Sequence, residues 1–436
     1  MTDTQETVLL VGGGGREHAI ARAVGESENA TLYACASNRN PGIAAVAEGS
    51  ETLEETDPEA VVDYAERVGA TLAVVGPEAP LQAGVADALD EAGVYAFGPR
   101  AEEARIETDK AFQREFMAEN DVPGTPTFET FTDPESAAEF VESAEDDVAV
   151  KPRGLTGGKG VRVTGDQVTK AEAADYVRES GYDDWVVEER LVGEEFTVQA
   201  FVANGELRVS PAIQDHKRAY EGDEGPNTGG MGSYSDARFE LPFMREEDYD
   251  EAVSILEALV DALSGYKGIL YGQFMLTADG PKVVEFNARF GDPEAMNTLP
   301  VLETDLVSVL RAARDGDPLP ELTFEARATV CKYAVPAGYP TDPAGGTRVA
   351  IDEASAEEAG ALLFYASVDA REDGIYTTTS RSFAVVGVAD SIREAEELAE
   401  AAIDEAGEEG LRVRHDIGTS ELLQRRIDHM RELRGE

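Results

Sequence analysis

Positive charge is what this 436-residue sequence lacks most: 8 lysines and 29 arginines stand against 88 aspartates and glutamates, for a net charge of −51 at pH 7. A field of that sign repels nucleic-acid phosphates and anionic lipid, so we expect no nucleic-acid partner and no membrane partner. The acidic residues are spread along the whole chain rather than gathered in one tail. This spread suggests a halophilic protein, because dissolved salt screens the mutual repulsion.

Cysteine is almost absent as well. Cys35 and Cys331 belong to no Cys-x-x-Cys motif and no Cys/His cluster, which excludes a disulfide scaffold and a zinc ribbon and favours a reducing compartment. No apolar run reaches the ~18 residues that a membrane helix needs. The first residues are acidic and unlike a signal peptide. We therefore expect a cytoplasmic protein.

Strand and helix patterns alternate over the first hundred residues. Strands are predicted at 7–11, 32–36, 72–75 and 94–97, and helices at 17–24 and 81–92. Such alternation is typical of a doubly wound parallel sheet. At roughly 150 residues per domain, the length predicts about three domains.

The remaining chain mixes the two patterns. Strands are predicted at 148–151, 185–189, 197–202, 207–214, 270–276 and 282–287, and helices at 109–120, 135–143, 172–179 and 247–263. A linker is predicted at 315–320, followed by a smaller α+β unit with strands at 328–335 and 383–388 and a helix at 392–406. The predicted class is multidomain, α/β and α+β.

Four glycines follow the first strand, where residues 12–18 read Gly-Gly-Gly-Gly-Arg-Glu-His and open a helix. A phosphate approaches most easily where Cβ atoms are absent and helix N–H groups point outward. One alternative is the dinucleotide site of a dehydrogenase or a regulatory protein. The second strand, however, ends without the acidic residue that holds ribose hydroxyls. A phosphorylated sugar therefore fits this turn better.

A second turn, Gly-Pro-Glu-Ala-Pro-Leu at 76–81, ends another strand of the same predicted sheet. Open α/β sheets bind ligands at the carboxyl ends of their strands. Alone the segment predicts only a turn, but beside the first glycine turn Glu78 can line a shared crevice.

A glycine loop with two lysines lies at 151–161, Lys-Pro-Arg-Gly-Leu-Thr-Gly-Gly-Lys-Gly-Val. Such a loop can fold over a triphosphate, with ammonium groups as point charges on its oxygens. It is not a Walker A motif, which has Gly-Lys-Ser/Thr at a helix start. Because lysine is so scarce, the positions of Lys110, Lys151 and Lys159 favour phosphate binding over solvated surface lysines.

The most informative segment is a late strand, Lys-Val-Val-Glu-Phe-Asn-Ala-Arg-Phe-Gly-Asp-Pro-Glu at 282–294. Alternation predicts one polar face with Glu285, Asn287 and Arg289, and one apolar face with Val284, Phe286, Ala288 and Phe290. Oxygen donors at that spacing suit Mg²⁺ held together with nucleotide phosphates, and Gln273 can add another oxygen. The alternative is a half-exposed strand with a Glu–Arg pair.

Two further segments are less specific. Residues 186–196, Val-Val-Glu-Glu-Arg-Leu-Val-Gly-Glu-Glu-Phe, fit either a nucleotide site or an ordinary charged strand. Residues 214–220, Gln-Asp-His-Lys-Arg-Ala-Tyr, lead into Gly-Pro-Asn-Thr-Gly-Gly-Met-Gly at 225–232, which predicts a substrate loop because it has no apolar period. His18 and His216 are candidate general bases, although an isolated histidine is more often a hydrogen-bonded bystander.

In this order, these motifs resemble those of the phosphoribosylamine–glycine ligase (glycinamide ribonucleotide synthetase) family, in the ATP-grasp superfamily. The resemblance runs from Gly12 to about Pro340 and continues more weakly beyond. It implies a phosphoribosylamine-binding domain over 1–107, an ATP-grasp domain over 108–318 with a mobile lid at about 124–190, and a C-terminal domain over 323–436.

The resemblance also implies a reaction and its participants. ATP would phosphorylate glycine to glycyl phosphate, and phosphoribosylamine would then displace phosphate to give glycinamide ribonucleotide and ADP, a step of de novo purine biosynthesis. The implied cofactors are ATP and Mg²⁺ or Mn²⁺. The partners are small molecules, and we expect a monomer. The alternative is another ATP-grasp carboxylate–amine ligase.

Matching the motifs residue by residue assigns implied roles. ATP would contact Lys110, Lys151, Gly157, Gly158, Lys159, Gly160, Glu188, Glu189, Leu191 and Glu195. The substrates would contact Gly13, Gly14, Gly15, Glu78, Asn227, Thr228, Gly229 and Arg289. Catalytic roles fall to Asp215, Lys217 and Arg289, with Asp215 and Arg289 on the two ends of glycine. The metal ligands would be Gln273, Glu285 and Asn287.

The chain departs from the family pattern in two places. Arg153 stands where the family has an aspartate, which changes a charge near the nucleotide. Residues 364–368 and 378–382 differ from the family's C-terminal motifs. Contacts from the C-terminal domain to the ribose or the nucleotide are therefore not carried over from the family.

Overall fold

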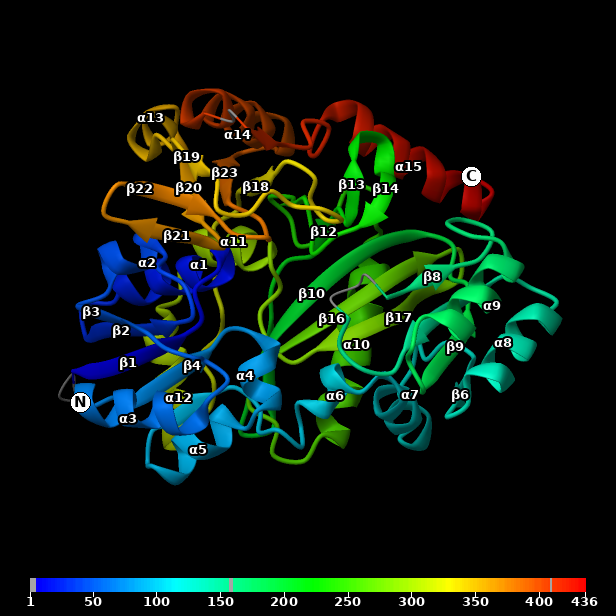
Figure 1. Ribbon diagram of the computed structural model, residues 1–436, viewed down its shortest axis with the longest axis horizontal. Coiled ribbons are helices and arrows are strands. Elements are labelled where there is room, and N and C mark those ends of the chain that lie inside the picture. The colour runs from blue at the N-terminus through cyan, green and yellow to red at the C-terminus, as the bar shows by residue number, and fades with distance from the viewer. Residues whose placement is uncertain (1–4, 157–159, 408–409) are drawn as a thin grey trace.

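The N-terminal part of the chain forms a parallel sheet in the order β3-β2-β1-β4-β5 (Figure 1). The computed structural model describes residues 5–156, 160–407 and 410–436. The strands of this sheet are β1 (Glu6–Val11), β2 (Ala30–Ala36), β3 (Gly49–Thr52), β4 (Leu72–Val75) and β5 (Tyr95–Phe97). Its connecting helices are α1 (Gly15–Gly25), α2 (Pro41–Val46), α3 (Pro58–Val68), α4 (Glu78–Gln82) and α5 (Val85–Glu91).

Helices cover both faces of this sheet. On one face, Val8 and Leu10 of β1 share a core with α1 and with α12 (Leu306–Asp315). On the other, Leu9 and Val11 share a core with α3 and α5. A strand buried on both faces has a continuous apolar sequence, as β1 does. The predicted doubly wound parallel sheet is confirmed.

Some N-terminal elements differ from the prediction. Helices α2 and α3 and strand β3 were not predicted from the sequence. Strand β3 reads Gly-Ser-Glu-Thr and carries no apolar signal. Helix α3 is nevertheless well capped, by the Asp57 carboxylate at its start and by Gly69 in a left-handed conformation at its end. The single helix predicted at 81–92 is wrong, because Gly84, with φ of 84°, separates α4 from α5.

A large antiparallel sheet forms the centre of the molecule, in the order β17-β16-β10-β12-β15-β18-β23-β20, with β11 beside β10 and β24 beside β18. Its strands are β10 (Glu194–Ala203), β11 (Glu206–Val209), β12 (Ile213–Asp215), β15 (Gly232–Ser235), β16 (Gly268–Thr277), β17 (Gly280–Asn287), β18 (Ala328–Pro336), β20 (Ala361–Tyr365), β23 (Phe383–Ala389) and β24 (Leu411–Arg412). The strand predicted at 207–214 is therefore two strands, interrupted at Ser210 and Pro211, since proline cannot donate to a ladder.

Helices flank the central sheet. They are α6 (Arg105–Thr108), α7 (Lys110–Glu119), α10 (Glu246–Ala262), α11 (Ala295–Thr298) with the 3₁₀ turn Leu299–Val301, α13 (Glu353–Glu358), α14 (Ile392–Ala406) and α15 (Ser420–Arg434). Helix α10 packs Ile255, Leu256 and Leu259 into the same core as Phe274 and Phe286 of the sheet. Among the described helices, none is both long and apolar enough to cross a membrane.

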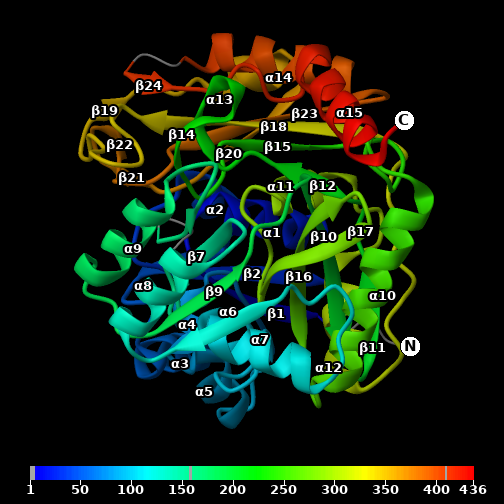
Figure 2. The same cartoon turned by 90° about the vertical axis from the view of Figure 1, so that its right-hand side faces the viewer.

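A smaller sheet stands to one side of the central sheet (Figure 2). Its strands are β6 (Phe128–Phe131), β7 (Val148–Pro152), β8 (Arg162–Val163) and β9 (Trp185–Glu189), in the order β6-β9-β7-β8. Helices α8 (Pro134–Ser143) and α9 (Lys170–Glu179) share its core with Trp185, which is fully buried. The lysine-bearing glycine loop joins β7 to β8, its antiparallel neighbour.

Two short ribbons complete the fold. One pairs β13 (Arg218–Tyr220) with β14 (Glu224–Asn227) around a 3₁₀ turn at Glu221–Asp223. The other contains β19 (Arg348–Val349), β21 (Val368–Arg371) and β22 (Gly374–Thr377). The β13–β14 ribbon lies beside α15, whereas β19, β21 and β22 are part of the C-terminal unit itself (Figure 1).

The segments before and after the predicted linker share one sheet. Strand β15 pairs antiparallel with β18, with Tyr234 opposite Val330. Strands β18, β23 and β20 therefore extend the central sheet across 315–320. The C-terminal unit is α+β, but its strands are hydrogen-bonded through this pair to the strands that precede the linker.

A β-bulge changes the predicted faces of the late strand. Gln273 of β16 lies opposite Glu285, whereas the next residue, Phe274, lies opposite Val283. Val284 is therefore an extra residue in β17. Val283 packs in the core with Phe286, while Val284 is only half buried, so the prediction that Val284 belongs to the apolar face is wrong.

Candidate active site

A cavity of ≈ 420 Å³ lies where the N-terminal sheet, the central sheet and the C-terminal unit meet. It brings together eleven of the predicted site residues: Gly13, Gly14, Glu78, Lys110, Asp215, Lys217, Thr228, Gly229, Glu285, Asn287 and Arg289. These residues come from six separate segments of the sequence. The cavity is thus the candidate active site.

The glycine turn reaches the cavity at the switch point of the parallel sheet. Strand β1 lies between β2 and β4, so the chain leaves β1 and β4 in opposite directions and opens a crevice at their carboxyl ends. Gly13 and Gly14 line the cavity from β1, and Glu78 lines it from β4. A Cβ on Gly13 would overlap the Asn38 side chain, which explains the requirement for glycine there. Gly15 begins α1 and faces Tyr333 instead.

Arg289 is held between two carboxylates. Its Nη2 lies 2.9 Å from Oε1 of Glu107, and its Nε lies 3.4 Å from Oε2 of Glu78. Burial disfavours the charge of Arg289, but Glu107 and Glu78 more than compensate and raise its pKa. The guanidinium is therefore a fixed positive charge in the cavity wall.

Glu107 has a carboxyl group whose pKa lies near neutral pH. Burial raises its pKa to about 7, against the opposing effect of Arg289. Its Oε2 also accepts the backbone N–H of Ala288, at 2.7 Å. Glu107 therefore holds both the side chain of Arg289 and the backbone next to it.

Glu285 and Lys217 form the second charged group of the cavity. Burial would raise the pKa of Glu285, but the cations around it, led by Lys217 and Lys110, lower it to about 2. Lys217 Nζ lies 3.8 Å from Glu285 Oε1 and 2.5 Å from Gln273 Oε1. Burial lowers the pKa of Lys217, but Glu285 and Glu195 raise it more, so the net shift is upward. Both groups are therefore charged at neutral pH.

Asp215 faces the cavity beside Glu294. Burial and the neighbouring Glu294 raise the pKa of Asp215, against Lys217 and Arg381. Glu294 accepts a hydrogen bond from the Tyr271 hydroxyl, at 2.8 Å. Asp215 and Glu294 are thus two neighbouring carboxyl groups in the cavity lining, which suit an ammonium ligand.

Lys151 lies just beneath the cavity rather than in its lining. Its Nζ contacts Oε2 of Glu188 at 2.7 Å and donates to the Val284 carbonyl at 3.0 Å. Arg114 pairs with the same carboxylate, with Nε 2.8 Å from Oε1. Burial lowers the pKa of Lys151, and the two cations keep the pKa of Glu188 below its usual value despite burial. The predicted ATP lysine is thus adjacent to the strand that carries Glu285.

The other predicted residues that the structure describes do not line the cavity. Glu195 accepts from Gln273 Nε2 at 2.7 Å, Glu189 accepts from the N–H of Thr127 at 2.9 Å, and the Gly160 carbonyl accepts from Tyr176. Leu191 follows β9, and Asn227 ends β14. Gly157, Gly158 and Lys159 lie outside the described residues.

The two candidate histidine bases lie outside the cavity. His18 is buried and accepts the N–H of Tyr365, and burial lowers its pKa to about 3. His216 lies between β12 and β13, is buried and does not line the cavity, and burial lowers its pKa to about 3 as well. Both are neutral at physiological pH, and neither is placed to exchange a proton with a ligand in the cavity.

Several lining residues were not predicted. They include Arg16, Asn38, Glu55, Glu107, Tyr271, Asp292, Glu294, Ser367, Ser380 and Arg381. Asp292 and Glu294 belong to the motif at 282–294, so their place in the cavity could have been predicted from their proximity to Arg289 in the sequence. Arg381 donates to the carbonyls of Gly229 and Gly230 and pairs with Asp292, Nη2 to Oδ2 at 3.0 Å. Ser367, Ser380 and Arg381 belong to the C-terminal unit, so this unit contributes to the lining of the cavity.

Family models account for most of the chain. Models of phosphoribosylglycinamide synthetase match residues 6–107 (N domain), 108–295 (ATP-grasp, A, domain) and 329–420 (C domain). The chain belongs to the phosphoribosylglycinamide synthetase family. The resemblance inferred from the motifs is therefore confirmed.

Individual relatives agree with this assignment. Phosphoribosylamine–glycine ligase of Methanococcoides burtonii is 53% identical, over 98% of this chain and 99% of the relative. The enzyme of that name from Methanosarcina barkeri is also 53% identical, over 98% and 100%. The crystal structure of phosphoribosylamine–glycine ligase from Thermotoga maritima superposes with a TM-score of 0.79 at 24% identity, over 94% of this chain and 99% of that one. This last likeness shows the shared fold.

Proposed function

We propose that this synthetase-family chain joins glycine to 5-phosphoribosylamine at the expense of ATP, giving glycinamide ribonucleotide, ADP and phosphate. The observation that carries the proposal is the single cavity in which Lys110, Glu285 and Arg289 meet the glycine turn of the N-terminal sheet. Relatives of the same name, 53% identical over nearly their full length, support it.

The two sides of the cavity suit the two substrates. The backbone of Gly13 and Gly14 at the start of α1, with Glu78 across the crevice, suits the phosphorylated sugar. Arg289 suits the carboxylate of glycine, and Asp215 suits its ammonium group. Thr228 and Gly229 close the space between them. Glycine therefore lies between the sugar and the phosphate-binding lysines.

The reaction needs charge control and alignment more than a nucleophilic side chain. A glycine carboxylate oxygen attacks the γ-phosphorus, the bond to ADP breaks, and glycyl phosphate forms. The amine of phosphoribosylamine then attacks the carbonyl carbon, phosphate leaves with one glycine oxygen, and the amide loses a proton. Lys110, Lys217 and Arg289 neutralise the charge that develops on the phosphoryl and acyl oxygens.

The donor chemistry fits a divalent cation at Glu285 and Asn287. Both line the cavity, the Glu285 carboxylate is ionised, and carboxylate and amide oxygens suit Mg²⁺ or Mn²⁺. When bound, the cation adds positive charge beside the ATP phosphates. The Gln273 oxygen accepts from Lys217, so Gln273 would contribute after Lys217 moves. In the described part of the chain, no group of three or more His, Cys, Asp or Glu side chains is arranged to hold a metal ion. Oxygens of ATP would supply the remaining ligands.

The remaining predictions complete the proposal. The adenosine end of ATP lies at Glu188, Glu189, Leu191 and Glu195, and the phosphates lie at Lys151 and the 157–160 loop. The division into 1–107, 108–318 with a lid at 124–190, and 323–436 stands as proposed. The chain acts as a monomer whose partners are small molecules. Both cysteines are free thiols, consistent with the cytoplasm.

Isotope transfer tests the proposal directly. Glycine labelled with ¹⁸O in its carboxylate, incubated with ATP, Mg²⁺ and phosphoribosylamine, is expected to yield ADP and phosphate carrying one ¹⁸O. ADP formation should require both glycine and the amine. Unlabelled phosphate would exclude the acyl phosphate route. Product formation with another carboxylate in preference to glycine would identify a different carboxylate–amine ligase.

A further inference from the structure

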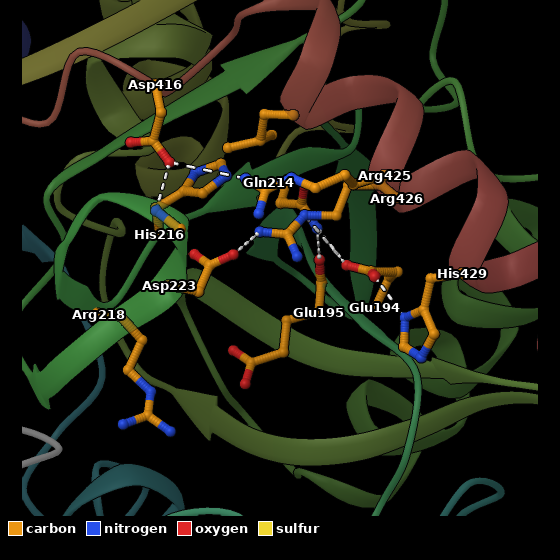
Figure 3. A network of polar contacts seen from close by, with 12 residues as sticks. Glu194, Glu195, Gln214, His216, Arg218, Asp223, Asp416, Arg425, Arg426 and His429 are labelled. Atoms are coloured by element: carbon orange, nitrogen blue, oxygen red, sulfur yellow. Dashed lines mark hydrogen bonds and ion pairs between the residues drawn. The ribbon is translucent and has the colours of Figure 1, made fainter.

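The last segment of the chain forms ion pairs and hydrogen bonds with the hairpin that leads into the candidate active site. We call residues 411–434, which comprise β24, the following turn and α15, the C-terminal strap, and the β13–β14 ribbon with residues 228–230 the substrate hairpin. Figure 3 shows Arg426 of the strap extending between Glu194 of β10 and Asp223 of the hairpin turn, with His429 on Glu194 as well. Helix α15 lies almost entirely beyond residue 420, where the C-domain family model ends.

The strap holds the hairpin at several points. Arg414, fully buried, donates to the Arg218 carbonyl and contacts Asp223 Oδ1, each at 3.1 Å. Asp416 accepts the N–H of Gly222 at 3.0 Å and fixes Arg414 by a bidentate pair. Arg426 Nη2 then lies 2.5 Å from Asp223 Oδ2. Asp223 has a positive φ of 61°, a conformation that aspartate adopts more readily than most residues, and Arg414 and Arg426 fix its carboxylate.

The hairpin in turn positions groups of the cavity. Thr228 donates from its N–H and from Oγ1 to the Lys217 carbonyl, at 2.7 and 2.8 Å. The N–H of Gly230 donates to Thr228 Oγ1 at 3.0 Å. Thr228, Gly229 and Lys217 all line the cavity. A shift of the hairpin therefore moves the region proposed to hold glycine.

Glu194, the other partner of Arg426, is connected to Lys217 through its neighbour Glu195. Glu194 is buried, contacting Arg426 Nε at 3.3 Å and His429 Nδ1 at 2.6 Å. The next residue, Glu195, accepts from Gln273, whose oxygen accepts from Lys217. Arg426 thus joins the two elements, β10 and the hairpin, that determine where the Lys217 ammonium lies.

We propose that Arg426 is a positioning residue for the ligase reaction: by bridging Glu194 and Asp223 it holds the substrate hairpin and Lys217 in the arrangement that binds glycine. This inference rests on the proposed function for its kinetic test. Without the guanidinium, Glu194 and Asp223 lose a shared cation and the hairpin loses its tie to α15. Glycine binding should weaken while the nucleotide contacts of the β7 side remain.

The kinetic test compares Arg426→Gln with Arg431→Gln, which removes the same charge from the outward face of α15, where Arg431 is 60% exposed. We expect Arg426→Gln to raise the KM for glycine by about 10- to 100-fold, with a smaller rise in the KM for ATP because Glu195 is proposed to contact the nucleotide, and Arg431→Gln to behave as wild type. Arg426→Lys should recover part of the loss. Asp223→Asn combined with Arg426→Gln should cost less than the sum of the single changes.

Hydrogen exchange provides a readout that does not depend on turnover. Amides of 218–231 should exchange faster in Arg426→Gln than in wild type or Arg431→Gln, with the rest of the chain unchanged. A folded Arg426→Gln with wild-type glycine KM and wild-type exchange over 218–231 would overturn the proposal. So would exchange that rises evenly over the whole chain in Arg426→Gln, Arg426→Lys and Asp223→Asn alike. A wild-type protein without glycine-dependent ADP formation would overturn the ligase function, while exchange still decides the role of the strap.

Discussion

At the scale of single residues, oppositely charged side chains in the cavity hold one another in place. Arg289 is fixed by Glu107 and Glu78, and Glu285 is kept ionised by the lysines around it. Charges held in place before the reaction need no rearrangement when the phosphoryl group moves. Removing one charge should therefore impair turnover far more than it impairs folding.

Glu285→Gln is the sharpest test of the proposed metal ligand. The amide preserves shape and removes the negative charge, so we expect kcat/KM to fall at least about 100-fold, with an unchanged far-UV circular dichroism spectrum. Glu251→Gln, an exposed carboxylate on α10, is the matched control. Near-normal turnover of Glu285→Gln at saturating Mg²⁺ would remove Glu285 from the metal site.

The ionisation of Glu107 predicts a pH dependence. Since its pKa is raised to about 7, Glu107 is increasingly protonated below pH 7 and increasingly ionised above it. Only the ionised form pairs with Arg289, so the KM for glycine should rise by up to about 10-fold between pH 8 and pH 6. Glu107→Gln should have a high KM that does not vary in this range, and Glu102→Gln, exposed on the same segment, should follow wild type. A Glu107→Gln profile with the wild-type inflection would assign the titration to another group.

At the scale of elements, the glycine loop is tied to α7 at its first residues. Arg153 pairs with Asp109, the N-cap of α7, through Nε to Oδ1 at 2.8 Å and Nη2 to Oδ2 at 2.7 Å. Lys110 follows Asp109 directly and donates from Nζ to the Gly154 carbonyl at 2.9 Å. Arg153, at which the chain departs from the family pattern, thus links the loop by an ion pair to the helix that carries Lys110.

Arg153→Ala measures the contribution of the Arg153–Asp109 ion pair. Arg153 is 39% exposed, and exposed ion pairs contribute ~0.2–1 kcal/mol. We therefore expect the KM for ATP to rise only about 2- to 5-fold, more at low salt than at high salt, with kcat and the KM for glycine unchanged. Arg178→Ala, which breaks exposed pairs on α9, is the control. An equal effect of both variants would show general destabilisation of this part of the fold.

At the scale of the whole molecule, the net charge of −51 is left largely unbalanced on the surface. Part of the positive charge is inside: Lys332 and Arg414 are fully buried and paired with carboxylates. The repulsion among the remaining acidic residues acts over about 10 Å at 0.1 M salt and is screened at higher concentration. Stability should therefore depend strongly on salt.

Thermal unfolding in KCl tests this dependence. We expect the Tm to rise by about 10 °C or more between ~0.1 M and ~2 M KCl, because screening removes repulsion from the folded state. Sucrose at matched osmolality, which stabilises by exclusion and screens nothing, should raise the Tm less. A Tm that is the same at both salt concentrations would rule out salt adaptation.

Much of the site could be predicted because its signals are local. The glycine turn at 12–15, the lysine loop and the polar strand through Glu285 each carry their chemistry within a few residues. Their convergence, implied by the motif order, is visible in the contact of Lys151 with the Val284 carbonyl, 3.0 Å away. The bulge at Val284 could not be predicted, because it depends on register with β16.

The sequence by itself determined the class of fold, the family and the residue types of the cavity, because periodicity and motifs are short-range properties of the chain. Only the tertiary structure decided that Glu107 holds Arg289, that Arg381 reaches the cavity through the shared sheet, and that Arg426 joins Glu194 to Asp223. These pairs are distant in the sequence, and their ionised groups are brought together by the packing of apolar cores to which they do not themselves contribute.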